Sequence, residues 1–310
     1  MSDQVSFDAL LPHAMAVKAE DLGVKKAKLP AADMFALAVL AGAFISIGAI
    51  FATTVAAGSM PVKDATGALA FTTGLPFGVG RLLTGLVFSV GLILVVVGGA
   101  ELFTGNALIM MAFASKKVTI AQLLRNWVIV YVGNFVGAIL TAYIVFLGKQ
   151  YTFGAGAIGL AALTTGESKT ALGFVQAIAL GIMCNALVCM AVWLCYSART
   201  TTDKILAIIP PIATFVAAGF EHSIANMYFI PLALFVKGDA AFLGTIGKTT
   251  ADFSHLTWGN FFVKNLLPVT IGNIIGGAFM VGLIYWFIYL HHQTHPVAHA
   301  AAAPAKAATD

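Results

Sequence analysis

Residues 99–106 read GAELFTGN, and they interrupt a stretch, 80–114, that is otherwise apolar enough to cross a bilayer. The octet puts a carboxylate, Glu101, among glycines where a membrane helix would be continuous. Non-helical backbone at membrane depth is tolerated only where protein buries it or where it lines water. An ionisable side chain at that depth faces a cavity or a partner. The octet therefore predicts a broken helix beside a polar path through the membrane.

Two further segments show that the chain repeats itself. The octet GFEHSIAN (219–226) matches the first octet as G-x-E-x4-N, 120 positions later, and NLLPVTIGNIIGG (265–277) matches NWVIVYVGNFVGA (126–138), 139 positions later. The pairs that share the spacing of 139 are Asn126/Asn265, Gly133/Gly272, Asn134/Asn273, Gly137/Gly276, Phe35/Phe174 and Gly42/Gly181. Matches in the same order along both halves indicate a duplicated unit.

The composition excludes a water-facing globule. Of 310 residues, 60% are hydrophobic and 10% are charged, and the mean hydropathy is +0.93. Soluble domains carry about 25% charged residues, whereas a spanning helix needs roughly 20 mostly apolar ones. The predicted spans are 32–57, 80–114, 119–147, 171–199, 204–237 and 257–290.

Each repeat, about 32–147 and 171–290, holds three spans, so the second repeat must enter the membrane from the opposite face. We therefore predict an all-α polytopic protein built from two inverted three-helix repeats, with helices 2 and 5 broken. The two octets then hold equivalent positions in oppositely oriented repeats. They should meet near the centre of the membrane, beside a permeation path.

The loop charges predict the orientation. With the N-terminus inside, ten Lys and Arg residues lie on the cytoplasmic side and seven on the other, which follows the positive-inside rule. We expect three parts: a cytoplasmic amphipathic segment (1–30), a channel domain (31–290) and a disordered cytoplasmic tail (291–310). The inner membrane of a bacterium is the predicted location. The net charge of +4 is too diffuse to predict binding to nucleic acid.

The segment before the first span has a helical apolar pattern with an expected stop at Gly23. Its apolar positions are Phe7, Leu10, Leu11, Met15, Ala19 and Leu22. The pattern predicts an amphipathic helix on the membrane face or at the pore mouth, and both an anchoring and a gating role stay open. The cysteines, Cys184, Cys189 and Cys195, have no pairing or metal-ligand spacing and are interpreted as small apolar residues.

The broken segments hold the candidate site residues. We expect Glu101 and Glu221 to satisfy amide donors freed by the breaks, and the asparagines Asn106, Asn226, Asn134 and Asn273 to form bonds between helices. His222 is predicted to be the central pore residue, since an unperturbed pKa of about 6.5 allows proton exchange near neutral pH. On sequence alone, the neighbouring apolar residues are expected to pack against helices or lipid: Phe88, Leu92, Leu102, Phe103 and Phe215.

Five segments together resemble the formate/nitrite transporter family, and within it the formate channels. They are FDALLPHAMA (7–16), GAELFTGN, NWVIVYVGNFVGA, GFEHSIANM (219–227) and LPVTIGNIIGG (267–277). The resemblance covers about residues 5–290.

The resemblance implies a homopentamer of aquaporin-like protomers, each with its own pore, and pH-dependent closure by the N-terminal segment. It implies that Leu102 and Thr104 lie on a loop that plugs or opens the pore, with Thr104 within reach of His222. Further implied roles are two apolar constrictions flanking the histidine (Phe88, Leu92, Leu102, Phe215), an anion-attracting lysine (Lys169) and two asparagines facing the central chamber (Asn185, Asn273).

A chemical mechanism follows from these expectations. A bare carboxylate in a dry constriction costs of order tens of kcal/mol before relaxation, so formate would cross more easily after His222 donates a proton or a strong hydrogen bond. Lys169 and half-helix dipoles would concentrate the anion. Whether a proton travels with formate decides between channel and symporter.

Three alternatives stay open. The first is the same fold carrying nitrite or hydrosulfide. The second is a neutral-solute channel, although the paired Asn-Pro-Ala motifs and filter arginine of such channels are missing. The third is a membrane enzyme, which no metal cluster, nucleophile–base pair or phosphate loop supports; we therefore predict no enzymatic activity and no cofactor. A metal bound by His291, His292, His295 and His299 is less favoured than a mobile tail.

Overall fold

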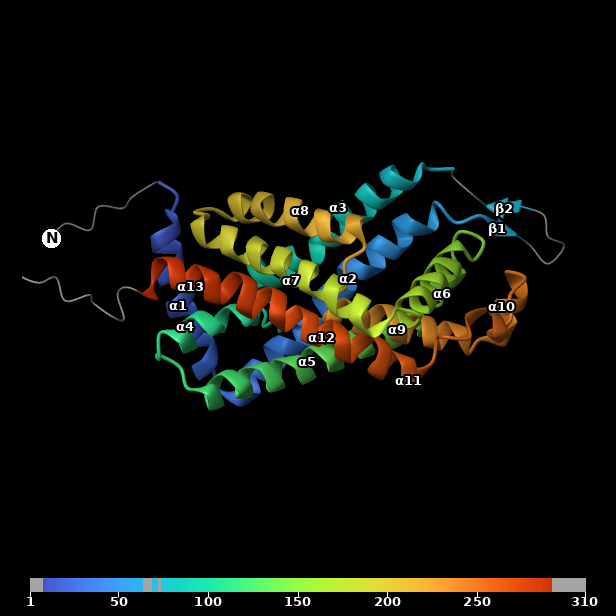
Figure 1. The fold of residues 1–310 in the computed structure, drawn as a ribbon. Helices are drawn as coiled ribbons and strands as arrows, with labels where there is room; N and C mark the ends of the chain where they lie inside the picture. The colour runs from blue at the N-terminus through green and yellow to red at the C-terminus, as the bar shows by residue number, and fades with distance from the viewer. Residues whose placement is uncertain (1–7, 64–68, 72–73, 292–310) are drawn as a thin grey trace, which may run out of the picture.

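The structure is a computed structural model that describes residues 8–63, 69–71 and 74–291. The body is elongated, with long helices running between two ends (Figure 1). Helices α1, α4 and α13 lie at one end, and α6, α10 and the strands β1 and β2 lie at the other. The predicted tail beyond residue 291 and the first seven residues lie outside the described part.

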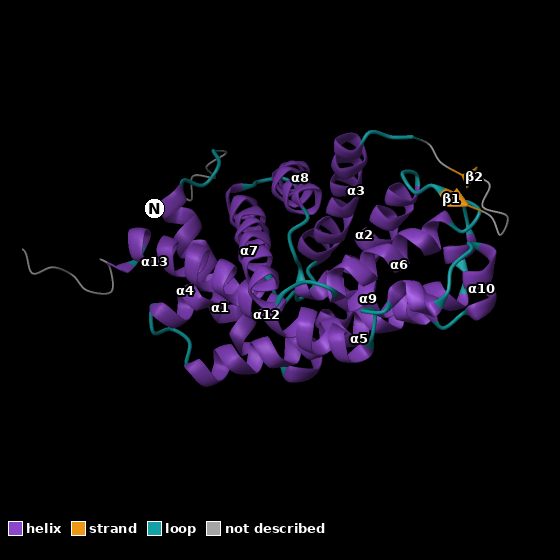
Figure 2. Cartoon of the chain, turned by 45° about the vertical axis from the view of Figure 1, so that its right-hand side comes forward, coloured by secondary structure: helices purple, strands orange, loops and turns teal. Residues whose placement is uncertain are grey.

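Almost all of the described chain is helical, as Figure 2 shows. The elements are α1 (Pro12–Lys28), α2 (Ala31–Ala57), β1 (Val62–Lys63), β2 (Leu69–Phe71), α3 (Phe77–Gly98), η1 (Gly105–Leu108), α4 (Ile109–Ala114), α5 (Ile120–Leu147), η2 (Gln150–Thr152), α6 (Ala157–Thr170), α7 (Phe174–Ser197), α8 (Thr201–Ala218), α9 (Ser223–Lys237), α10 (Ala240–Thr245), η3 (Thr250–Phe253), α11 (Trp258–Asn260), η4 (Phe261–Leu266), α12 (Leu267–Ile274), η5 (Ile275–Leu283) and α13 (Ile284–Tyr289).

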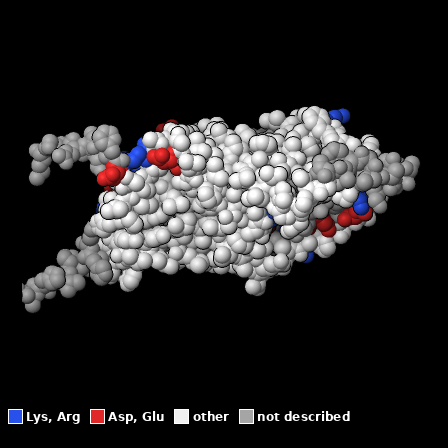
Figure 3. Space-filling model, turned by 90° about the horizontal axis from the view of Figure 1, so that it is seen from above, with Lys and Arg blue, Asp and Glu red and all other residues white. Residues whose placement is uncertain are grey.

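The predicted membrane-spanning helices are confirmed: the described residues contain 6 helical stretches long and apolar enough to cross a membrane. The predicted second and fifth spans are each interrupted, as expected. In the second, α3 ends at Gly98 and η1 begins at Gly105; in the fifth, α8 ends at Ala218 and α9 begins at Ser223. Figure 3 shows Lys, Arg, Asp and Glu gathered at the two ends of the molecule, with a broad band of other residues between them. That band fits a lipid environment, because charged side chains avoid it.

Glycines let the spans approach closely. A Cβ added to Gly137 on α5 would lie 2.0 Å from the Val39 carbonyl oxygen of α2. In the other half, a Cβ on Gly276 would lie 2.1 Å from the Ile182 carbonyl oxygen of α7. Small residues at such crossings are typical of membrane helix packing.

The bonds in the structure correct the predicted register of the first span in each half. In the first half, the carbonyls of Leu37 and Ala38 accept from the Glu101 N–H and from Asn134 Nδ2. In the second half, the carbonyls of Leu180 and Gly181 accept from the matched groups, the Glu221 N–H and Asn273 Nδ2. The matched positions on α2 and α7 therefore differ by 143. The pairs Phe35/Phe174 and Gly42/Gly181, which differ by 139, are therefore wrong by four residues. Four residues are about one helical turn, so the slip leaves the helix face unchanged.

The spacing of 139 does hold for the third span. Tyr131 on α5 and Thr270 on α12 differ by this number, and their hydroxyl oxygens are hydrogen-bonded at 2.8 Å. Two matched positions that touch each other lie on the axis that relates the halves.

The all-α fold class is confirmed, and the described chain adds to it a small antiparallel pair, β1 and β2. One other expectation is wrong: helix α1 does not stop at Gly23 but continues to Lys28. An added Cβ at Gly23 would lie 3.0 Å from the Ala112 side chain, so this glycine lets α1 pack closely against α4. The short helix α6, between the halves, was not expected.

Candidate functional site

Both breaks begin in the same way. Gly99 follows α3 with φ 77°, and Gly219 follows α8 with φ 80°. Only glycine adopts this left-handed conformation routinely, so each octet starts with the residue that ends its helix. The second residue after each glycine donates its backbone N–H to a neighbouring helix: Glu101 to the Leu37 carbonyl of α2 and Glu221 to the Leu180 carbonyl of α7, each at 3.3 Å.

One buried asparagine holds each break open. In the first half, Asn134 Oδ1 accepts the Phe103 N–H at 2.9 Å, and its Nδ2 donates to the carbonyls of Ala38 and Glu101 at 2.7 and 2.9 Å. These bonds supply partners for backbone groups that the missing helical turn leaves exposed, as a buried break requires.

The second half repeats the arrangement with Asn273. Its Oδ1 accepts the Ser223 N–H at 2.9 Å, and its Nδ2 donates to the carbonyls of Gly181 and Glu221 at 2.9 and 3.0 Å. The freed amides are thus satisfied by asparagine side chains. The expectation that the Glu101 and Glu221 carboxylates would do this is wrong.

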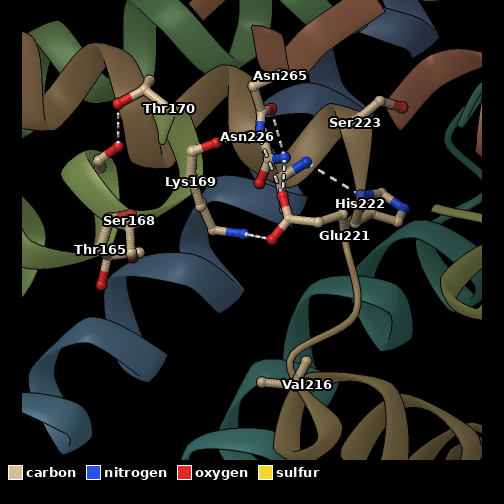
Figure 4. Close-up of polar contacts among 12 residues, drawn as sticks. Thr165, Ser168, Lys169, Thr170, Val216, Glu221, His222, Ser223, Asn226 and Asn265 are labelled. Atoms are coloured by element: carbon tan, nitrogen blue, oxygen red, sulfur yellow. Dashed lines mark hydrogen bonds and ion pairs between the residues drawn. The ribbon is translucent and has the colours of Figure 1, made fainter. Parts of the chain in front are cut away.

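Each carboxylate instead belongs to a cluster of side chains. In Figure 4, Glu221 lies between Lys169 of α6 and the amides of Asn226 and Asn265. Glu221 Oε1 is 2.7 Å from Lys169 Nζ, and its Oε2 accepts from Asn226 Nδ2 at 2.7 Å. Asn265 Nδ2 also donates to the Lys169 carbonyl at 3.0 Å.

The first half has the same cluster at the opposite end of the molecule. Glu101 pairs with Lys26 of α1 at 2.6 Å and accepts from Asn106 at 2.7 Å, and Asn126 donates to the Lys26 carbonyl at 3.1 Å. Helices α1 and α6 therefore hold equivalent places, and Lys26 is the counterpart of Lys169. Sequence reasoning missed Lys26 because the predicted register was one turn off; the corrected spacing of 143 joins the two lysines.

His222 and Thr104, from the two breaks, meet at the centre. The Thr104 Oγ1 atom lies 3.0 Å from His222 Nε2, as the resemblance implied. His222 is also the N-cap of α9, because its Nδ1 accepts the Ala225 N–H at 3.0 Å. Both side chains are buried, at 3% and 0% exposure.

Two cavities approach this contact from opposite ends. The first, called the α6 vestibule, has a volume of about 370 Å³, and the second, called the α1 vestibule, about 540 Å³. The α6 vestibule is lined by residues that include Arg81, Phe88, Lys169, Phe215, Glu221 and His222. The α1 vestibule is lined by residues that include Lys18, Lys26, Leu92, Glu101, Leu102 and Lys204.

The apolar residues expected to form constrictions divide between the two vestibules. Phe88 and Phe215 pack edge to face, with centroids 5.7 Å apart, and the Phe215 ring lies 5.9 Å from the His222 ring. Leu92 and Leu102 line the other side. The two vestibules share no lining residue. The aromatic pair and His222 therefore line one vestibule, and the leucine pair lines the other.

Two of the candidate pore residues, Phe103 and Asn273, line neither vestibule and instead make the helix contacts expected of them from sequence alone. Phe103 lines neither vestibule; its ring packs against Tyr131 and Trp127 of α5, with centroids 4.9 and 6.0 Å away. Asn273 uses its Oδ1 and Nδ2 atoms in holding the break. Asn185 does reach the centre, since its Nδ2 donates to the carbonyls of Thr104 and Asn273 at 3.2 and 2.7 Å. Its Oδ1 is buried without a partner among the described residues.

The vestibules differ in charge. In the α6 vestibule, the ion pair with Glu221 cancels the charge of Lys169, which leaves Arg81. In the α1 vestibule, the Lys26–Glu101 pair leaves Lys18, Lys25 and Lys204. Burial lowers the pKa of Lys18, and the nearby charges of Lys204 and Arg199 lower it further. Sequence reasoning missed Arg81, although it is the one basic residue inside a predicted span of the first repeat before the break.

No group of three or more His, Cys, Asp or Glu side chains that could hold a metal occurs in the part of the chain that the structure describes. The histidines proposed as an alternative metal site, apart from His291, lie beyond the described residues. The three cysteines are buried and unpaired, within a packed helix.

Comparisons with known proteins identify the relatives of the chain. A family model described as formate/nitrite transporter matches residues 13–287. The formate channel FocA of Escherichia coli K12 is 46% identical over 291 residues, covering 93% of this chain and 98% of its own. FocA of Haemophilus influenzae is 37% identical, with coverage of 94% and 99%. A solved structure of a pentameric formate channel with formate bound superposes with a TM-score of 0.76 at 45% identity, covering 84% of this chain and 98% of that one.

Proposed function

Because the chain belongs to the formate/nitrite transporter family, we propose that it passes formate across a bacterial inner membrane through a pore in each protomer. The similar proteins reported above are formate channels, and the solved structure among them is a pentameric channel with formate bound. We extend this ligand and this assembly to the present chain. Nitrite or hydrosulfide is the second candidate, because a small pore with one histidine distinguishes poorly among small monovalent anions. Catalysis has no place in this proposal.

One observation carries the proposal: a histidine and a threonine from the two broken helices touch between two vestibules. The Thr104–His222 contact, 3.0 Å long, is the polar step between the Phe88–Phe215 pair and the Leu92–Leu102 pair. An anion that reaches this point has lost its water and needs hydrogen-bond donors. Both side chains can supply one.

The bonds of His222 define what it donates. Nδ1 accepts the Ala225 N–H, so the proton of the neutral ring sits on Nε2. The Nε2–H group then points at Thr104 Oγ1, or at an anion that displaces it. In a doubly protonated ring, Nδ1 would also carry a hydrogen, and two donors, this N–H and the Ala225 N–H, would face each other. In this geometry His222 therefore acts as a neutral hydrogen-bond donor, and full protonation requires the N-cap bond to break.

A neutral acid crosses the apolar steps more easily than an anion. By analogy with Asp, formic acid titrates near pH 4, so the neutral form is scarce in water at pH 7. Asn185 donates its Nδ2 to the Thr104 carbonyl, and its Oδ1, which has no partner among the described residues, is the acceptor that we assign to the acid O–H. Formic acid has oxygens that accept hydrogen bonds and one O–H that donates, so it matches donors at His222 and Thr104 together with an acceptor at Asn185. Formate has only accepting oxygens, so it matches the two donors alone.

The surroundings fit a pentameric membrane protein with α1 in the cytoplasm. Exposed apolar side chains on α5, such as Val128 and Ile144 at 62% and 66% exposure, need lipid or a second protomer to cover them. The α1 end carries the excess of Lys and Arg expected of the cytoplasmic side. Because α1 holds Lys26 against Glu101 beside the Leu102 loop, it can close or open the α1 vestibule, which supports a gating role for residues 1–30.

The test is formate flux into liposomes that contain the purified protein and an internal pH dye, measured beside nitrite and glycerol. His222→Phe, which keeps the ring volume and removes the donor, should abolish formate flux and leave the oligomer intact by gel filtration. His255→Phe is the matched control, because His255 is an exposed histidine outside both vestibules.

The outcomes separate the alternatives. Formate uptake with a matching pH change supports a proton-linked path, and formate current without one means that the anion crosses charged. Wild-type formate flux in His222→Phe contradicts the role of the histidine. Glycerol swelling without formate flux contradicts the proposed function.

A further inference from the structure

Arg81 is a cation in the α6 vestibule that the Lys169–Glu221 pair does not explain. It lies on α3, half-buried, and lines the same cavity as His222. Its Nε donates to the Ala217 carbonyl at 2.9 Å and its Nη2 to the Val216 carbonyl at 2.7 Å. Among the described residues, no carboxylate forms an ion pair with it.

The charge of this vestibule can be counted residue by residue. The titratable side chains that line it are Arg81, Lys169, Glu221 and His222. Lys169 Nζ lies 2.7 Å from Glu221 Oε1 and 5.7 Å from the centre of the Phe229 ring. Since that pair is internally neutral and His222 is neutral when it accepts the Ala225 N–H, the one uncompensated full charge among the described lining residues is that of Arg81.

The backbone alone does not make this vestibule positive. Helix α8 ends at Ala218, and the carbonyls of its last turn carry a partial negative charge equivalent to about half an electron. Helix α9 begins at Ser223 on the other side of the same break, and its N-terminus carries a partial positive charge of similar size. Without Arg81 these two helix ends and the neutral ion pair sum to about zero, so the vestibule would not attract anions. With Arg81 the sum is positive.

We infer that Arg81 is the anion-recruiting residue of the α6 vestibule, in place of the role expected for Lys169, and that it acts on the small monovalent anion that the pore conducts. The inference rests on the proposed function. Lys169, by contrast, positions Glu221 and through it the break that carries His222.

Recruitment by a full charge has a signature that a packing role lacks. Attraction between a fixed charge and an anion in a water-filled mouth weakens as salt screens it, with a Debye length of about 30 Å at 0.01 M and about 8 Å at 0.15 M. Such attraction raises the local anion concentration and the association rate. It acts on capture, so it changes flux at low formate more than flux at saturation.

The experiment measures formate uptake in right-side-out membrane vesicles, where external formate meets the α6 vestibule if α1 is cytoplasmic, and in inside-out vesicles. Variants are Arg81→Gln, which keeps a hydrogen-bond donor without charge, and Arg81→Lys, which keeps the charge with fewer bonds. Lys248→Gln removes one charge from the same end of the molecule outside the vestibule and serves as the control.

We expect Arg81→Gln to lower uptake at subsaturating formate and low salt by about 10-fold, the lower end of the range for electrostatic capture. The loss should appear in right-side-out vesicles and shrink to less than about twofold in 0.3 M salt. Arg81→Lys should recover at least half of wild-type uptake and its salt dependence, and Lys248→Gln should match wild type.

Two results would overturn the inference. One is Arg81→Gln uptake that falls with salt as steeply as wild type. The other is Arg81→Lys that loses as much as Arg81→Gln, which would mean that Arg81 acts through its bonds to the end of α8. A wild-type protein that carries no formate at all contradicts the proposed function itself. Gel filtration and thermal unfolding of each variant identify a folding defect, and Arg81→Lys then decides the question.

Discussion

Replacing Asn273 with alanine should damage the second break in a measurable way. The side chain is fully buried and makes three hydrogen bonds, to the Ser223 N–H and to the carbonyls of Gly181 and Glu221. Each bond contributes about 0.5–1.5 kcal/mol, and bonds between membrane helices average about 0.6 kcal/mol. We expect the free energy of unfolding to fall by about 2–4 kcal/mol.

The matched variant is Asn134→Ala, because Asn134 makes the same three bonds in the first half. Unfolding by SDS titration in mixed micelles should give losses within about 1 kcal/mol of each other. Formate flux should differ, since Asn273 fixes the groups on both sides of His222 and Asn134 those on both sides of Leu102. We expect at least a tenfold loss of flux in Asn273→Ala and a smaller loss in Asn134→Ala.

The reasoning is refuted if Asn273→Ala unfolds like wild type, or if both variants lose flux equally at full stability. Asn260→Ala is the control. Asn260 is a half-buried asparagine whose side chain donates one bond, to the His255 carbonyl, and its loss should cost less than about 1 kcal/mol.

Two more predictions concern packing and pH. Gly137→Ala should destabilise the fold by about 1–3 kcal/mol, because the new Cβ would lie 2.0 Å from the Val39 carbonyl oxygen. Gly148→Ala is the control, since its Cβ would meet nothing closer than 3.5 Å. In a thermal melt, this control should be neutral or stabilising. Tyr151→Phe should cost about 1 kcal/mol at pH 7, since it removes the 2.6 Å bond to Asp239. That bond, with the Phe242 N–H, lowers the pKa of Asp239, so the Asp239 contribution is present above the usual Asp pKa and is lost as pH falls through the lowered one. Melts from pH 7 to pH 3 should therefore bring variant and wild type together, and a constant difference would contradict the assignment.

The sequence predicted the spans and the two breaks, because each depends on a strong local signal. Glycine, carboxylate and asparagine inside an apolar stretch have few explanations in a membrane. The contact of Thr104 with His222 was expected from the family resemblance, and the Tyr131–Thr270 bond was not predicted.

What the sequence could not predict depends on contacts between distant segments. The partners of Glu101 and Glu221 are lysines 75 and 52 positions away, and no local pattern distinguishes them from nearby amides. The register of α2 against α7 failed by one turn because such a slip preserves the apolar face. Because of that slip, Lys26 was not matched to Lys169. The role of Arg81 was not predicted because its partners are backbone carbonyls, which leave no side-chain pattern in the sequence.

The contact between Tyr131 and Thr270 has a meaning for the history of the chain. A half-length ancestor that paired with an inverted copy of itself would carry identical residues at every matched position. Leu102 and His222 are matched by the spacing of 120, so such an ancestor would have had two leucines or two imidazoles at its centre. Fusion of a duplicated gene removes that constraint. Within one fused chain, one break can hold a leucine at the centre and the other a hydrogen-bond donor, so each half can change without the other.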